Sequence, residues 1–399
     1  MSSLGAVQAN FGRAEAAATL FEAAWEKQAD QEILVRWANA RLELGELEQA
    51  AELFAQAHAG RESMSEAMQA FHAASYAQLK VIEGNVDQAL DLAQTAAEVA
   101  PVGSVDEVFA TDTLAQVLFH SGDWPRAVEA GRRALALGID YYGDPHLQVA
   151  TSRNNLALFL GRLGEDEEAL DLLEQATRDF ETLLGSDDPR LAVTYSNLGN
   201  RRSLQRRFEP AITAYDRALQ LTALHYGNDH SWIGLILGYK GRNAQRMGEL
   251  DTAADLFRQA MVTLGDSPNH RGRVRLAWAS NEALVGDLEA ALEMLDLARM
   301  DLESVHPEGH PQRLAIDELK AQIHLEQGED EAAAVLISKL RQTSPDGSPA
   351  LNLLEAQTAA KTHDCEQARR LWSDLDQSTE MEKPVLFRLA MQAIERTCS

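Results

Sequence analysis

The chain has 399 residues, of which 45% are hydrophobic and 25% are charged, so it has enough apolar material to form a folded structure. Its 36 basic and 62 acidic side chains give a formal net charge of −26, which argues against binding to DNA, RNA or an anionic membrane, because those partners are polyanions. No apolar run approaches the roughly 18 residues of a membrane-spanning helix, and the N-terminal segment lacks the basic-then-apolar order of a signal peptide.

A short pattern recurs along the whole chain. It consists of glycine, any residue, a bulky residue, two further residues and alanine, as in GELEQA, GNVDQA and GDWPRA, while RRFEPA and HDCEQA lack the glycine. We take the final alanine as the anchor of each repeat, and the ten anchors are Ala17, Ala50, Ala89, Ala127, Ala169, Ala211, Ala253, Ala291, Ala333 and Ala368. Successive anchors are 33, 39, 38, 42, 42, 42, 38, 42 and 35 residues apart, so repeats organise the fold.

Other positions keep a fixed distance from each anchor. Alanine or glycine stands twelve residues before all ten anchors, alanine stands seven residues after the first eight, and a large side chain usually stands four residues after. Small residues at these spacings allow two helices to approach closely, and the large side chain fills the space between them. The pattern therefore predicts two helices per repeat. The first ends at the glycine five residues before the anchor, where a left-handed backbone is needed, and the second carries the anchor.

This arrangement resembles the tetratricopeptide repeat, which pairs Leu-Gly with a later Gly-x-Tyr-x-x-Ala motif. The resemblance is carried by NLA at 155–157, NLG at 197–199 and GELDTAADLFRQA at 248–260. The three successive 42-residue spacings, with DPHLQVA, DDPRLAV and NDHSWIG before first helices, are similar to the kinesin light chain subclass, which is common in bacterial signalling proteins. The resemblance implies an all-α, right-handed superhelical solenoid of about ten stacked antiparallel helix pairs.

The two ends of the array differ in the sequence. Residues 1–381 are expected to form the repeat array, in which the first helix of the first repeat is shortened. Residues 382–399 are expected to form a C-terminal helix that covers the apolar face of the last repeat. The abrupt start favours the hypothesis that a further region, such as a catalytic or signalling domain, precedes the array or is encoded separately.

The two cysteines, Cys365 and Cys398, are expected to be neighbours. Cys365 starts the last second helix, and Cys398 ends the capping helix that should run antiparallel to it. A disulfide requires Cα atoms roughly 4.4 to 6.8 Å apart. Whether the two thiols are bonded depends on the compartment, because the cytosol keeps thiols reduced.

No catalytic motif is present in the sequence. The phosphate-binding GxxxxGK[ST], the zinc-binding HExxH and the nucleophile GxSxG are all absent, and no metal site or cofactor is predicted. His306 and His310 fall in a turn between repeats, where a structural role is favoured over metal binding. Asp187 and Asp188 precede a helix and are interpreted as capping its free amides. We therefore expect a protein that is not an enzyme.

A stack of helix pairs presents the first helices on its concave surface. At about 100° per residue, positions 18, 15, 14, 11, 8 and 7 before each anchor share the face that points into this groove. For three central repeats this register, with Arg201 placed on the rim, predicts the ligand-binding residues Asn154, Asn155, Arg162, Asn197, Asn200, Arg201, Tyr239, Arg242 and Arg246.

The central repeats also differ from the rest of the chain in charge. Residues 195–250 contain eight basic and four acidic side chains, which makes this segment +4 and the remainder −30. A solvated or internally paired cluster is the alternative to a binding surface. The amides could hold a peptide backbone and the arginines could bind carboxylates, so the groove is predicted to prefer an extended segment with acidic side chains or a C-terminal carboxylate.

The sequence thus predicts a protein–protein interaction scaffold that binds a peptide or protein segment in its groove. The alternative is the regulatory or sensor region of a bacterial multidomain signalling enzyme, such as a serine/threonine kinase, with the groove occupied by its own segment. The expected location is the cytoplasm, or the periplasm if a membrane anchor precedes the array.

Overall fold

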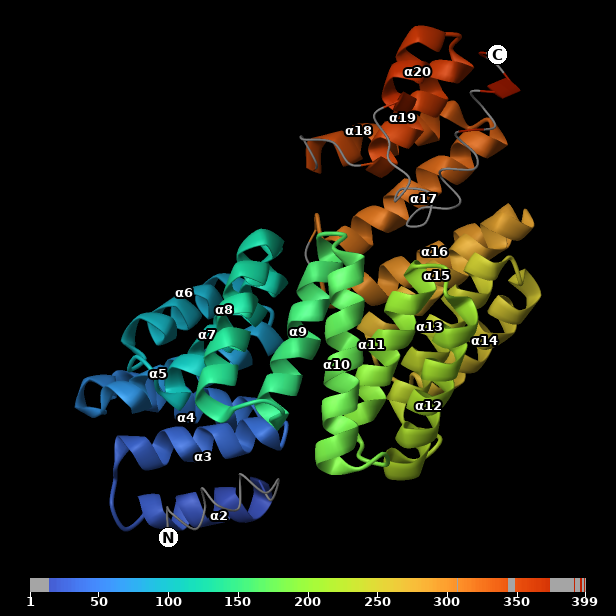
Figure 1. Ribbon diagram of the computed structural model, residues 1–399. Helices are drawn as coiled ribbons and strands as arrows, with labels where there is room; N and C mark the ends of the chain where they lie inside the picture. Colours follow the sequence, from blue (N-terminus) through green and yellow to red (C-terminus); the bar gives the residue numbers. More distant parts are fainter. Residues whose placement is uncertain are drawn as a thin grey trace. The chain divides into compact units, whose positions relative to one another are not determined.

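The computed structural model describes residues 14–306, 308–343, 349–373, 391, 395–396 and 398. Within these residues the chain is all helical, and no strand is present. Clustering of contacts divides it into two compact units, Met1–Asp188 and Pro189–Ser399. Consecutive helices pack as pairs in both units, as Figure 1 shows.

Each unit consists of successive helices joined by short turns. In the first unit these are α2 (Ala14–Trp25), α3 (Gln31–Glu43), α4 (Leu47–Ala59), the 3-10 turn η1 (Arg61–Ser63), α5 (Glu66–Ile82), α6 (Val86–Val99), α7 (Val105–Ser121), α8 (Trp124–Tyr142), α9 (Leu147–Arg162) and α10 (Asp166–Leu184). In the second they are α11 (Arg190–Leu204), α12 (Phe208–Tyr226), α13 (Ser231–Met247), α14 (Leu250–Thr263), α15 (Pro268–Val285), α16 (Leu288–Glu303), α17 (Pro311–Gln327), α18 (Asp330–Thr343), α19 (Pro349–Lys361) and α20 (Cys365–Ser373).

The predicted repeat register is confirmed by burial. All ten anchor alanines are 0% exposed, and each lies three residues after the start of its helix. The small residues twelve before the anchor are also buried wherever the structure describes them. At Gly199 and Gly241 an added Cβ would lie 2.7 Å from the rings of Tyr215 and Phe257, the large residues four after the anchors. The small residue is therefore required by the ring that packs against it.

The turns within the repeats have the predicted left-handed residue. Gly45, Gly84, Gly122, Gly164, Gly248, Gly286 and Gly328 all have φ between 75° and 98°, five residues before their anchors. Arg206 and His363, which replace glycine in two repeats, have φ of 58° and 62° at the same position. The turn thus imposes its backbone on whichever residue occupies it.

The longer spacing of the central repeats extends their second helices. The helices α8, α10 and α12, which belong to the 42-residue repeats, each have 19 residues, whereas α4, α6 and α14 have 13 or 14. The extra residues of these repeats therefore lengthen the second helices.

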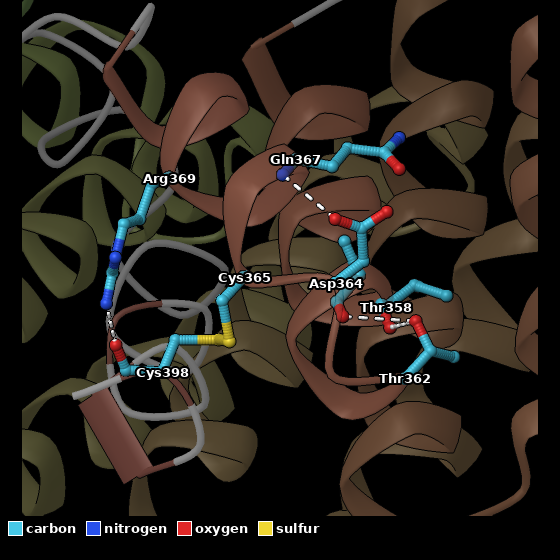
Figure 2. The surroundings of a disulfide bond; sticks show 8 residues. Thr358, Thr362, Asp364, Cys365, Gln367, Arg369 and Cys398 are labelled. Atoms are coloured by element: carbon cyan, nitrogen blue, oxygen red, sulfur yellow. Dashed lines mark hydrogen bonds between the residues drawn. A yellow bond between two sulfur atoms is a disulfide. The ribbon is translucent and has the colours of Figure 1, made fainter.

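The C-terminal end is joined to the last repeat by a disulfide. Cys365 at the start of α20 is bonded to Cys398, with Cα atoms 5.4 Å apart, so the predicted proximity is confirmed. The Arg369 guanidinium, one turn along α20, donates to the Cys398 carbonyl, and Figure 2 shows both contacts. Most of the expected capping helix, 382–399, lies outside the described residues.

Candidate functional site

The candidate site is the face formed by the six predicted positions on each first helix, which we call the first-helix face. These positions lie on α3, α5, α7 and α9 in the first unit and on α11, α13, α15, α17 and α19 in the second. Each unit is considered separately.

Contacts between successive first helices join these positions side by side. In the first unit, burial raises the pKa of Asp112 on α7, and the side chain of Asn155 on α9 is near enough to oppose that rise. In the second, Arg246 Nη1 of α13 donates to Ser203 Oγ of α11 over 3.1 Å. Farther along that unit, Arg273 Nη2 of α15 donates to Tyr239 Oη of α13 over 3.2 Å. All of these residues occupy predicted positions, so successive first helices meet at these positions within each unit.

Six of the nine predicted site residues are partly buried on this face. They are Asn155, Asn197, Asn200, Tyr239, Arg242 and Arg246. Arg162, at the end of α9, is exposed, and its guanidinium carbon lies 5.8 Å from the ring centroid of Phe119 on α7. Arg242 and Arg246 are thus half-buried rather than fully exposed, and Ser203 of the preceding first helix covers part of Arg246.

Asn154 and Arg201 differ from the prediction. Asn154 is only 9% exposed, and its amide donates to Asn155 Oδ1 over 3.4 Å. Arg201 is 8% exposed rather than lying open on the rim. A helical wheel gives the direction of a side chain but not how closely the next helix packs over it, so burial at these two positions was not predictable.

The two arginines of α13 converge on a buried tyrosine of the preceding repeat. Tyr215 on α12 is 0% exposed. Burial raises the pKa of its hydroxyl well above the usual range, while the nearby charges of Arg246 and Arg242 oppose that rise. Both charges thus act on the same buried hydroxyl, and the bond to Ser203 restrains Arg246. Guanidinium groups at this position are suited to binding a carboxylate.

Arg273 extends this basic cluster and was missed in the sequence. It stands eighteen residues before Ala291, which is one of the six predicted positions, but the register was applied only to the three central repeats. Its guanidinium carbon lies 5.8 Å from the ring centroid of Tyr239. Applying the register to every anchor would have found it.

Histidines have a structural role at three helix starts. His146, His230 and His310 are the N-cap residues of α9, α13 and α17, and in each the ring Nδ1 accepts the backbone N–H two residues later. His306 stacks on His310 with ring centroids 3.7 Å apart. Burial, aided by the charges of His306 and Arg313, lowers the pKa of His310 to about 4, so the ring stays neutral and can accept that bond.

The described residues also bear on metal binding and on membrane insertion. Within the described residues, no group of three or more metal-ligating side chains is close enough to hold a metal ion. In the same part of the chain, no helix is both long and apolar enough to cross a membrane.

Residues 107–182 and 153–223 each match the model of the Tetratricopeptide repeat family. Over residues 107–223 the chain is therefore built of tetratricopeptide repeats. The resemblance expected from its motifs is therefore confirmed, and the match spans α7 to α12. Among curated proteins, none matches the sequence.

Solved structures share the fold of this chain. A Rap protein complexed with competence and sporulation factor is 15% identical, with a TM-score of 0.63, over 86% of this chain and 96% of its own. The apo form of the quorum sensor NprR from B. thuringiensis is 14% identical, with a TM-score of 0.63, over 82% and 92%. The apo form of RapI is 16% identical, with a TM-score of 0.56, over 69% and 99%. The chain therefore has the same helical-repeat fold as these proteins.

Proposed function

We propose that this protein is a non-enzymatic scaffold that holds an extended peptide or protein segment on its first-helix face. The observation that carries the proposal is the placement of Arg242 and Arg246 on α13, where Arg246 is held by Ser203 and the charges of both arginines act on buried Tyr215. Restrained side chains lose little conformational entropy when a ligand binds, which favours recognition at this point. The structurally similar Rap protein was solved complexed with competence and sporulation factor.

The chemistry of the second unit favours a segment that carries carboxylates. Arg242, Arg246 and Arg273 supply positive charge on adjacent first helices in a protein whose net charge is −26. Asn197 and Asn200 on α11 carry amides that can donate to and accept from a peptide backbone. Acidic side chains or a C-terminal carboxylate would form charge-assisted hydrogen bonds with the arginines, each worth about 1.5 to 3 kcal/mol. The surrounding negative surface would repel acidic segments that do not reach them.

The test begins with affinity purification on the full chain and identification of the proteins that it retains. Replacing Arg242 and Arg246 together by glutamate should weaken binding of the retained partner at least tenfold, because two favourable contacts become repulsive. The matched control replaces Arg126 and Arg258, which are exposed on the second helices α8 and α14, by glutamate and changes the net charge equally. Equal affinity of the α13 variant and the parent protein, with helical content preserved, would contradict the assignment of the site.

The disulfide supports the expected alternative location over the cytoplasm. Bonds such as Cys365–Cys398 form and persist in oxidising compartments, whereas cytosolic thiols are kept reduced. We infer that the protein works in an oxidising compartment. Alkylation of the native protein in cell extracts, with and without prior reduction, tests this: labelling of both cysteines before reduction would contradict it.

A further inference from the structure

A recess lies on the first-helix face of the first unit, outside the segment 195–250 that the charge pattern singled out. It is a cavity of about 500 Å³ lined by the N-terminal parts of α3, α5 and α7, together with the end of α8 and the start of α9. This volume lies within the range of roughly 300 to 1,000 Å³ that ligand-binding pockets occupy. Its residues Glu32, Phe71 and Phe109 all stand eighteen positions before an anchor, in the same register as Arg273.

The apolar part of the cavity is aromatic. The rings of Phe71 on α5 and Phe109 on α7 lie with their centroids 5.5 Å apart, and both side chains are only partly buried. Met68, from the turn of α5 before Phe71, is buried at the same wall. Partly buried aromatic rings at the wall of a recess can gain further apolar contact when a bulky side chain enters.

The polar part contains more negative than positive charge. Glu32 and Asp106 contribute two carboxylates, and Arg36 contributes one guanidinium. Within the part of the chain that the structure describes, none of these three groups forms an ion pair. Glu32 accepts one hydrogen bond, from Ser65 Oγ over 3.0 Å.

Asp106 has an environment that a cation would improve. Burial raises the pKa of its carboxyl group, which the charge of Arg36 only partly offsets. A carboxylate that has lost hydration without gaining an ion pair is stabilised when a cationic group binds beside it. The negative charge of the whole protein would also speed the approach of a basic segment.

We propose that this cavity is a binding subsite for a basic peptide segment, in which a bulky apolar side chain enters between Phe71 and Phe109 and a neighbouring lysine or arginine pairs with Glu32 and Asp106. The inference rests on the proposal that the first helices form a peptide-binding face. It adds a subsite whose charge preference is opposite to that of the arginines on α13.

The test uses three blocked pentapeptides with a fluorescent label: acetyl-Gly-Lys-Phe-Lys-Gly-amide, the same peptide with alanine for phenylalanine, and the same peptide with glutamate for both lysines. The full protein should bind the first peptide at least tenfold more tightly than either of the others in fluorescence anisotropy. Equal binding of all three, or no binding of the first at millimolar protein, would overturn the proposal.

Isosteric variants then locate the subsite. Glu32→Gln together with Asp106→Asn is expected to weaken binding of the lysine–phenylalanine peptide at least tenfold. The control is Glu48→Gln with Glu52→Gln, two exposed acids on the second helix α4, which removes the same charge and should change affinity less than twofold. Equal losses in the two variants would indicate general attraction to a negative protein, and would overturn the assignment to this cavity.

Photo-crosslinking to the parent protein locates the bound peptide without depending on the stability of the variants. With benzoylphenylalanine in place of the peptide's phenylalanine, the crosslink should map to α5 or α7, and a crosslink elsewhere would place the peptide outside the cavity. The Arg242→Glu, Arg246→Glu variant should bind this peptide as the parent protein does. A failure of the acidic-segment site on α13 is therefore distinguishable from a failure of this subsite.

Discussion

At the scale of single residues, the tightest constraint in each repeat is one backbone angle. The residue five before the anchor has positive φ in all nine repeats in which it is described, and seven of those residues are glycine. Glycine adopts this conformation without strain, whereas other residues pay about 1 to 2 kcal/mol for it. Arg206, at φ 58°, is therefore in a strained conformation at the end of α11.

Replacing Arg206 by glycine is expected to stabilise the protein by about 1 kcal/mol, because relief of the strain exceeds the entropy that glycine adds to the unfolded chain. Urea denaturation of the parent protein and the variant measures the change in the free energy of unfolding. The corresponding opposite change, Gly248→Ala, should destabilise by a similar amount, since alanine would have to adopt φ near 84°. A destabilised Arg206→Gly protein would mean that the side-chain contacts of Arg206 outweigh the strain.

A second residue-scale prediction concerns pH. His72 is 1% exposed, its Nε2 lies 3.2 Å from the Phe54 carbonyl oxygen, and burial lowers its pKa to about 4. Because the folded pKa is below the unfolded value of about 6.5, the unfolded chain binds the proton first, and stability falls as pH drops from 6.5 towards 4. At pH 4.5 the loss from this residue should reach about 2 kcal/mol.

The comparison that isolates this effect is His72→Phe, which keeps a ring in the cluster with Phe54, His58 and Tyr76 but cannot titrate. Unfolding free energies at pH 7 and pH 4.5 should differ by about 2 kcal/mol less in the variant than in the parent protein. An identical pH dependence in both proteins would show that His72 is already accessible to protons in the folded state.

At the scale of the helix, the size of one residue is coupled to the ring that faces it. The paired helices α13 and α14 approach so closely that a Cβ on Gly241 would lie 2.7 Å from the Phe257 ring. Other repeats have alanine at this position. They accommodate it by a different separation of the two helices or by a smaller residue four after the anchor, as with Ala157 and Leu173. Helix pairing therefore depends on matched residues twelve before and four after the anchor.

Gly241→Ala is expected to destabilise the protein by about 1 to 3 kcal/mol, even though alanine has a helix propensity about 1 kcal/mol better than glycine. The added methyl group must displace a fully buried ring. When Phe257→Leu is also present, Gly241→Ala should destabilise the protein less, because the smaller leucine leaves room for the added methyl group. A double-mutant cycle from thermal or urea unfolding gives the coupling, and simple additivity of the two changes would argue against direct contact.

At the scale of the whole molecule, the sequence by itself determined the repeat architecture. Ten buried anchors, the left-handed turns and the pairing of helices follow from local spacing, because each repeat packs on its neighbours through the same positions. The family assignment needed only such local motifs. The register also placed these positions on one side of each first helix, on α7 and α9 in the first unit and on α11, α13 and α15 in the second, since the angle between side chains on a helix is nearly constant.

Tertiary structure decided what that face contains. Charge pointed to the central repeats, but it could not show that Asn154 and Arg201 are buried, that Arg273 joins Tyr239, or that Glu32, Phe71 and Asp106 line one cavity. These outcomes depend on how closely successive first helices approach and on the residues that meet between repeats about 40 positions apart in the chain. A helical periodicity describes one helix at a time, so the depth of a recess and the partner of each charge emerge only when the helices are packed together.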